Sequence, residues 1–567
     1  MIFRSGRRWA TAVFATVLFA AAGAHAEDKQ KPVPGGALEV GTIFSTLSAL
    51  SWDHKDWPWK INHDTGTIYE MLLAGDVSKS RGHGGPYLFK ADAWLPTDAI
   101  RGELAEKWEI RRDPLAAVFT LRKGVMFAAK PGVMEARELT AEDVVWSYYY
   151  RRNSPRMTQG FLDDVEKVVA LDRYTVVFYL KRYFADWEYR FGYGYNAAIM
   201  PKEVADAGAG DWKNATGSGP FMITSYVPGN SHVYTKNEKY WDSETINGHK
   251  VKLPLVDTVT YRIIKDDSTR LTAFKTGKLD ILEAVGWESM ESLKKAAPQI
   301  KYNEWTNVYG NTFIMRTDTK PFDDIRVRRA LNMAINKDEI IKSFYNGHAE
   351  MMAYPQHPDF TGYYEPLKDM PESVKELFVY NPAKAKKLLA EAGYPNGFTF
   401  KVQVCSCNNE NMDLLPLISA YLEQVGVKIE IQPMEYAAFL SVMSNKTHTA
   451  GYYMNIGNTN PLTAIRKSFI TGQRWNPSMW SDPAFDKKMA DIDQEEDETV
   501  RMKLTKELNR DVLDKAMHIW LPSRKLFTVW WPWVKNYDGE LTAGAVRPGP
   551  IYARLWIDRE LKKKMGF

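Results

Sequence analysis

The side chains of this 567-residue chain that could do chemistry are suited to holding a ligand. Cys405, Cys407 and Asn408 stand close together, and a second polar run covers residues 455–461. Amide side chains with aromatic neighbours are typical of sites that bind sugars or peptides. The two cysteines are the only ones in the sequence, and they could be free thiols or joined by a strained bridge. No histidine cluster accompanies them, so they give weak support for a metal site.

Aromatic and basic residues add further candidates for ligand contacts. Trp52, Trp57 and Trp59 could stack on a sugar ring or an apolar group, or they could pack into the core around a proline-broken loop. Trp480 is a later aromatic candidate. Arg524 could pair with a carboxylate or phosphate of a ligand, and an ion pair within the protein is an equal alternative.

Sequence motifs of catalysis are missing. Gly192-Tyr193-Gly194 lacks the third glycine and the Lys-Ser/Thr pair of a phosphate-binding loop. The ten histidines form no His-Glu-x-x-His zinc motif, and no serine lies in a nucleophile elbow. A carboxylate pair or a dispersed triad leaves no linear pattern, so a secreted hydrolase stays as an alternative. We predict a binding protein with no catalytic residue, no metal and no cofactor.

The elements around the polar runs predict where those runs lie. Apolar residues alternate over 398–404 and again over 427–431, with a helical pattern between them, which predicts a βαβ unit with two parallel strands. Ligands of such sheets lie beyond the carboxyl ends of the strands. Residues 405–409 therefore become candidates for the rim of a pocket. The same argument applies to residues 455–461, because they follow an apolar run that ends at Met454.

The N-terminus predicts export from the cytoplasm. Three arginines among the first eight residues precede an apolar run over 10–22, and Ala24-His25-Ala26 offers small residues for a signal peptidase. Residues 1–26 are therefore a predicted signal peptide, and the mature chain is expected to be soluble and periplasmic. Loss of the three arginines lowers the formal net charge from +4 to +1, which gives no electrostatic support for nucleic-acid binding.

Several blocks of sequence have a specific order. Leu104-Ala-Glu-Lys-Trp108 precedes a predicted strand that ends in Leu121-Arg122, then come Gly124-Val-Met-Phe127 and Thr140-Ala-Glu-Asp143-Val. Thr140 followed three residues later by Asp143 also predicts a helix N-cap.

These blocks resemble the signature of the family 5 solute-binding proteins, the extracytoplasmic receptors of peptide-type ABC importers. Further blocks that resemble the family are Gly217-Ser-Gly-Pro-Phe221, Asn237-Glu-Lys-Tyr-Trp241, the turn that ends at Asp280, and the run over 321–331. The resemblance covers nearly the whole mature chain.

The resemblance implies a two-lobed α/β clamshell of the type II periplasmic binding protein fold, with an extra subdomain in lobe one. Two crossovers, expected near 261–264 and 520–522, would form the hinge. The expected division is lobe one over 27–70, 195–264 and 520–567, the extra subdomain over 71–194, and lobe two over 265–519.

The resemblance also implies a monomeric receptor that encloses a solute between its lobes and passes it to an inner-membrane ABC permease. Family members bind peptides, oligosaccharides, opines or nickel complexes. Peptide binders often carry an aspartate for the ligand's α-amine, but this sequence has Gly457 there, and Met454 replaces the preceding aromatic residue. We still expect a peptide-like solute, with an oligosaccharide, an opine, a metal chelate or a chaperone-like peptide role as alternatives. The expected ligand-binding residues are Trp52, Cys407, Asn408, Met454, Asn455, Gly457, Asn458, Trp480 and Arg524.

Overall fold

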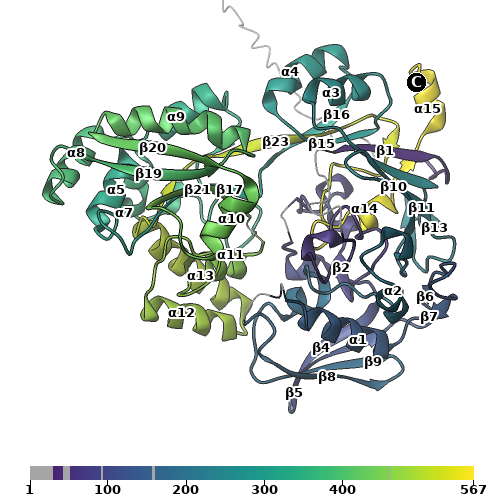
Figure 1. Ribbon diagram of the computed structural model, residues 1–567. Coiled ribbons are helices and arrows are strands. Elements are labelled where there is room, and N and C mark those ends of the chain that lie inside the picture. Colours follow the sequence, from purple (N-terminus) through teal and green to yellow (C-terminus); the bar gives the residue numbers. More distant parts are fainter. Residues whose placement is uncertain (1–29, 43–50, 91–92, 156, 158–159, 458) are drawn as a thin grey trace, which may run out of the picture.

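The computed structural model describes residues 30–42, 51–90, 93–155, 157, 160–457 and 459–567. The predicted signal peptide and Asn458 therefore lie outside the described residues. The described chain forms two α/β bodies joined near β23 (Ser523–Trp530), as Figure 1 shows. We call them lobe one, up to residue 306 and again from 523, and lobe two, which covers 309–520. None of the helices in the described part of the chain has the length and apolar character that a membrane crossing requires.

Lobe one is built on an eight-stranded mixed sheet. Its strands are, in spatial order, β10 (Phe221–Val227), β11 (Ser231–Lys236), β14 (Thr258–Ile263), β1 (Ala37–Thr42), β15 (Ile281–Val285), β23 and β16 (Lys301–Thr306), and β18 (Ala349–Glu350), which comes from lobe two, is paired to β23. β1 is parallel to both of its neighbours, and α3 (Asp267–Lys275) and α4 (Trp287–Ala296) connect β14 to β15 and β15 to β16. The smaller elements of lobe one are β2 (Leu73–Gly75), β3 (Ile100–Gly102), α2 (Lys202–Asp206), β12 (Ser243–Ile246), β13 (His249–Lys252), β24 (Val534–Lys535), α14 (Gly549–Tyr552), β25 (Trp556–Ile557) and α15 (Arg559–Lys564).

The extra subdomain of lobe one carries the most specific sequence blocks. It is a four-stranded antiparallel sheet, in the order β4 (Ala105–Arg112), β5 (Leu115–Leu121), β9 (Thr175–Leu180) and β8 (Val165–Asp172), beside the short pair β6 (Met126–Phe127) and β7 (Arg137–Glu138). Helix α1 (Ala141–Arg152) packs against β8 and β9. The predicted N-cap is confirmed, because Thr140 and Asp143 form a reciprocal capping box at the start of α1.

Lobe two holds the predicted βαβ unit, which the structure confirms. Its five-stranded sheet has the order β20 (Val427–Met434), β19 (Phe398–Cys405), β21 (Gly451–Gly457), β17 (Tyr309–Met315) and β22 (His518–Trp520). β19 is parallel to β20 and β21, and α9 (Asn409–Glu423) connects β19 to β20. The other helices of this lobe are α5 (Ile325–Met333), α6 (Lys337–Glu339), α7 (Glu372–Lys375), α8 (Pro382–Glu391), α10 (Tyr436–Ser444), α11 (Pro461–Phe469), α12 (Pro483–Gln494) and α13 (Glu498–Asp514).

The lobes have separate hydrophobic cores, which locate the crossovers of the chain. One core takes buried residues from 38–300 and 527–557, and the other takes them from 313–521. β15 and β16 follow residue 264, yet they pair in the sheet of lobe one, so the first crossover lies after β16 and not at the predicted 261–264. The difference arises because β15 pairs in parallel with β1, which keeps the chain in this sheet. The return lies between β22 and β23, beside the expected 520–522.

A single buried carboxylate joins distant parts of lobe one. Asp280 is 0% exposed, and its Oδ2 accepts the backbone N–H of Glu39 on β1 at 2.9 Å. Its Oδ1 accepts the indole N–H of Trp533 at 2.7 Å and pairs with Lys562 of α15 at 2.8 Å. These hydrogen bonds and the ion pair offset the cost of burying the carboxylate inside the fold. The family-like turn that ends at Asp280 therefore has a structural role.

Candidate functional site

The site begins at one edge of the lobe-two sheet. β19, β20 and β21 end at Cys405, Met434 and Gly457, and parallel strands bring these ends to the same edge. Gly457 pairs with Tyr309, which is the first residue of β17 after the chain enters lobe two. The edge therefore lies beside the crossovers and faces the junction between the lobes, where the βαβ topology predicts a ligand.

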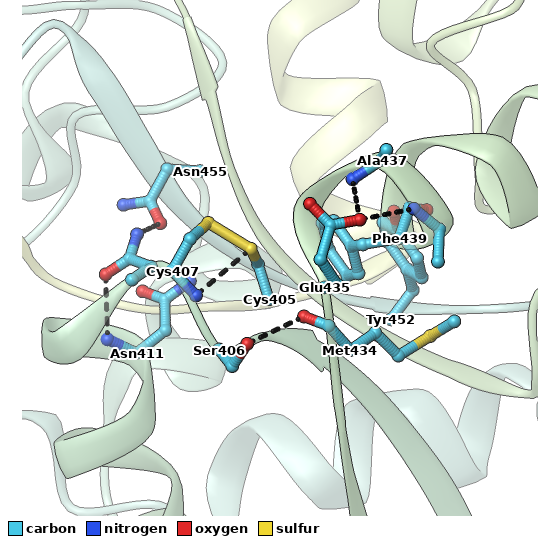
Figure 2. Close-up of a disulfide and its surroundings, with 12 residues drawn as sticks. Cys405, Ser406, Cys407, Asn411, Met434, Glu435, Ala437, Phe439, Tyr452 and Asn455 are labelled. Carbon is cyan, nitrogen blue, oxygen red and sulfur yellow. Dashed lines mark hydrogen bonds between the residues drawn. A yellow bond between two sulfur atoms is a disulfide. The ribbon is translucent and has the colours of Figure 1, made fainter.

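The loop after β19 is closed by a disulfide. Figure 2 shows the bond between Cys405 and Cys407, with an S–S distance of 2.08 Å and a Cα–Cα distance of 5.1 Å. Asn408 accepts the backbone N–H of Asn411 at 3.1 Å as the N-cap of α9, and its Nδ2 donates to Oδ1 of Asn455 at 2.9 Å. The two polar runs expected at the rim are thus in contact, and the bridge answers the question that the sequence left open.

A charged pair lies next to this loop. Nε of Arg524 on β23 is 3.1 Å from Oε2 of Glu410, in the first turn of α9. The hydroxyl of Tyr345 donates to the other oxygen of Glu410 at 2.8 Å, and burial raises the pKa of Tyr345 well above its usual value. Arg524 therefore makes the ion pair within the protein that the sequence left as an alternative. A guanidinium carries five N–H donors, so Arg524 can hold Glu410 and a ligand oxygen together.

Other predicted ligand residues lie elsewhere. Trp52 is 2% exposed and packs edge-on against Tyr226 at 5.0 Å, so it belongs to the hydrophobic core and not to a ligand surface. Met454 is buried as well, and its carbonyl accepts the hydroxyl of Thr312 at 2.7 Å. Trp480 lies two residues after Ser478, whose carbonyl accepts the backbone N–H of Thr317. Thr317 follows β17 at the end of that strand away from Tyr309. Trp480 is therefore at the opposite edge of the sheet from the rim, where Gly457 and Asn455 remain.

The two lobes also touch on the side of the molecule away from β23. The backbone N–H of Ala185 donates to the carbonyl of Asp493 at 2.7 Å. Asp186 of lobe one is 2.8 Å from Nε of Arg190 and 3.2 Å from Nη1 of Arg466, which belongs to lobe two. Nε of Arg466 donates to Asp493 at 3.0 Å. We call these four charged residues (Asp186, Arg190, Arg466 and Asp493) the cross-lobe ion cluster.

Sequence reasoning missed Glu410, Tyr345 and the cross-lobe ion cluster. Glu410 had a local signal, because an acidic residue two positions after an N-cap asparagine is favoured by the helix dipole. The cluster had none, since Asp186 and Arg466, which pair in it, are 280 positions apart. In the described part of the chain, no cluster of three or more His, Cys, Asp or Glu side chains is placed to hold a metal ion.

Removing the disulfide should weaken solute binding more than it lowers stability. A bridge across one intervening residue closes a very short loop, so it contributes only about 1–2 kcal/mol to the free energy of unfolding. Without the bridge, the loop over residues 405–407 no longer fixes the position of Asn408 against Asn455. For Cys405→Ser/Cys407→Ser we expect the dissociation constant to rise about tenfold, or about 1.4 kcal/mol, in calorimetric titration.

The matched control for this prediction is Ser406→Ala. Ser406 lies between the two cysteines and donates to the carbonyl of Met434 at 3.0 Å, but its side chain takes no part in the disulfide. The affinity of the Ser406→Ala protein for the solute should stay close to that of the wild type. Equal affinity of the oxidised protein and the double serine variant would contradict a role of the bridge in binding.

Comparison with known proteins agrees with this architecture. The family model described as "Bacterial extracellular solute-binding proteins, family 5 Middle" matches residues 99–477. Heme-binding protein A of Haemophilus influenzae is 30% identical over 377 residues, which are 62% of this chain and 65% of that protein. The dipeptide-binding protein of Escherichia coli is 27% identical over 451 residues, 74% of this chain and 80% of that protein.

A solved structure supports the fold. The ABC transporter-associated periplasmic binding protein DppA from Helicobacter pylori, in complex with peptide STSA, matches with a TM-score of 0.73 at 23% identity. The match covers 93% of this chain and 99% of that chain. The predicted two-lobed α/β fold of the periplasmic binding protein type is thereby confirmed.

Proposed function

We propose, from the premise that this chain belongs to the family 5 bacterial extracellular solute-binding proteins, that it captures a peptide-like solute between its two lobes. In this proposal the protein acts in the periplasm and delivers the solute to an ABC permease in the inner membrane, without catalysis. The observation that carries the proposal is the rim beside the crossovers, where Asn408 contacts Asn455 and Arg524 pairs with Glu410, two residues after Asn408.

The chemistry of this rim favours a solute with a carboxylate and amide groups. Arg524 offers N–H donors for a carboxylate, and Asn408 and Asn455 can exchange hydrogen bonds with peptide groups. A neutral oligosaccharide would use the amides but leave Arg524 unused. An opine carries a carboxylate as well, so it is the alternative nearest to a peptide. The relative from Escherichia coli is named for dipeptide binding, which supports the peptide class.

Binding in this proposal is coupled to the movement of the lobes. Two strand connections join the lobes, and the cross-lobe ion cluster closes the opposite side. A solute that contacts both lobes favours the closed form by its differential affinity for that form, and by no more. The permease would then distinguish the closed form from the open one.

A thermal-shift screen of peptides, opines, oligosaccharides and metal chelates tests the proposed function. We expect short peptides to raise the unfolding temperature of the mature protein, because a ligand that binds only the folded form stabilises it by mass action. Mass spectrometry of the recovered solute should show it unchanged. A response to neutral oligosaccharides alone would contradict the peptide class, and conversion of the solute would support the hydrolase alternative.

A further inference from the structure

A small cavity of about 50 Å³ lies between the lobes, near the cross-lobe ion cluster. Lobe one contributes Glu188 and Tyr193 to its wall, and lobe two contributes Asn460, Glu498 and Arg501. The cavity lies close to the rim, because Asn460 comes three residues after Gly457, the last residue of β21. Its volume suits an ammonium group, which is about the size of a water molecule, but not an aromatic ring.

Two carboxylates from opposite lobes line this cavity beside the guanidinium of Arg501. Oε1 of Glu188 accepts the indole N–H of Trp108 at 2.7 Å, and Oε1 of Glu498 accepts the hydroxyl of Thr97 at 3.1 Å. Neither carboxylate has an ion-pair partner among the residues that the structure describes. Burial raises the pKa of Glu188, and the neighbouring charge of Glu498 raises it further, against the hydrogen bond from Trp108 and the charge of Arg501. The structure thus brings two like charges from different lobes close together.

Each arginine near the cavity already has ion-pair or hydrogen-bond partners within the protein. Arg190 and Arg466 neutralise Asp186, and Arg466 also neutralises Asp493. Arg501 is the cation in the cavity wall, but its Nε donates to the hydroxyl of Tyr363 at 3.2 Å and its Nη1 donates to the carbonyl of residue 495 at 2.8 Å. The negative charge of Glu188 and Glu498 is therefore only partly compensated.

Asn460 gives independent evidence that a ligand group enters the cavity. It is 3% exposed, and its Oδ1 is fixed as the N-cap of α11 by the backbone N–H of Thr463 at 2.8 Å. Its Nδ2 lacks a hydrogen-bond partner in the described structure. A buried donor without a partner is costly, so such a donor in a cavity wall points to an oxygen supplied from outside.

We propose that this cavity holds the amino group of the solute between Glu188 and Glu498, while Nδ2 of Asn460 donates to the adjacent carbonyl oxygen of the solute. This inference rests on the proposed function and names its ligand class as a primary amine beside a carbonyl group, such as the amino end of a peptide. It supplies an amine anchor in a chain that has Gly457 where an aspartate was expected. Because the two carboxylates come from different lobes, the bound amine also favours closure.

Calorimetric titration with two matched peptides tests the inference. Ala-Ala-Ala carries the free amine, and N-acetyl-Ala-Ala-Ala lacks its charge. The wild type should bind the free peptide at least tenfold more tightly, and Glu188→Gln and Glu498→Gln should each remove most of that difference. The control is Glu496→Gln, which removes an exposed cross-lobe pair with Arg112 near the same helix start. Its affinity should stay within about twofold of the wild type, because exposed pairs contribute little.

Unfolding of the ligand-free variants separates lost binding from lost folding. Both glutamine variants should be at least as stable as the wild type, because each removes a contact between like charges. Equal affinity of the wild type for the two peptides overturns the inference, and so does unchanged affinity in both variants, while binding itself would still support the proposed function. A response to maltotriose and to neither peptide also overturns it. A protein that responds to no peptide, opine, sugar or chelate contradicts the proposed function and the inference together.

Discussion

The Arg466→Met protein should bind its solute at least tenfold more weakly than the wild type and unfold several degrees earlier. Arg466 pairs with Asp186 across the lobes and with Asp493 inside lobe two, and these side chains are largely buried. Removing one partner of a buried pair costs about 3–5 kcal/mol, because the remaining charge keeps its desolvation penalty. The closed form loses its cross-lobe bond, so a larger share of the molecules stays open. Calorimetric titration and thermal unfolding measure the two effects.

The matched control is Arg474→Met, since Arg474 is an exposed arginine of the same lobe whose Nε donates to a serine hydroxyl at 3.1 Å. Both quantities should stay near the wild-type values. In the open form Asp186 keeps Arg190 and Arg466 keeps Asp493, so opening leaves no charge of the cluster without a partner. A variant at Arg466 with wild-type affinity would show that the cross-lobe ion cluster plays no part in closure.

Asp280→Ala should destabilise lobe one by about 3–5 kcal/mol, which is the cost of breaking a buried charged network. The change leaves the N–H of Glu39, the indole N–H of Trp533 and the amine of Lys562 without their acceptor. Urea unfolding followed by tryptophan fluorescence is suited to this measurement, because Trp531 and Trp533 stack at 4.6 Å in the same region.

An exposed aspartate elsewhere in lobe one provides the comparison for Asp280. Asp206 of α2 pairs with Lys202, and both side chains are more than half exposed, so Asp206→Ala should cost less than about 1 kcal/mol. Similar losses at the two positions would show that the buried carboxylate is not what joins β1 to α15.

Patterns of neighbouring residues gave the parts of the fold that could be predicted. Alternation and helical spacing specify the βαβ unit of lobe two, and the Thr140–Asp143 pair specifies the start of α1, because each depends on contacts within a few residues. The first crossover could not be found in this way. Its place depends on β15 pairing with β1, about 240 residues earlier in the chain, and long-range pairing leaves no local pattern.

The candidate site was predictable to a similar extent. Topology put residues 405–409 and the run from residue 455 at strand ends, and in the structure Asn408 and Asn455 are in contact. Tryptophan is equally suited to a core and to a ligand surface, so composition could not show that Trp52 packs inside lobe one. The partner of Arg524 was unknown for another reason: Glu410 meets it only after the return of the chain through β23.

The way lobe two is inserted restricts how the molecule can move. Thr306, at the end of β16, is the register partner of Lys525 on β23, so the chain leaves and re-enters lobe one at neighbouring points. A body held at one place by two adjacent connections swings more readily than it slides. Displacement in a swing grows with distance from the pivot, and in Figure 1 α12 and α13 lie at the end of lobe two away from β23. A pair of fluorophores on α12 and the extra subdomain would therefore report the largest change in separation, whereas labels near β23 would report almost none.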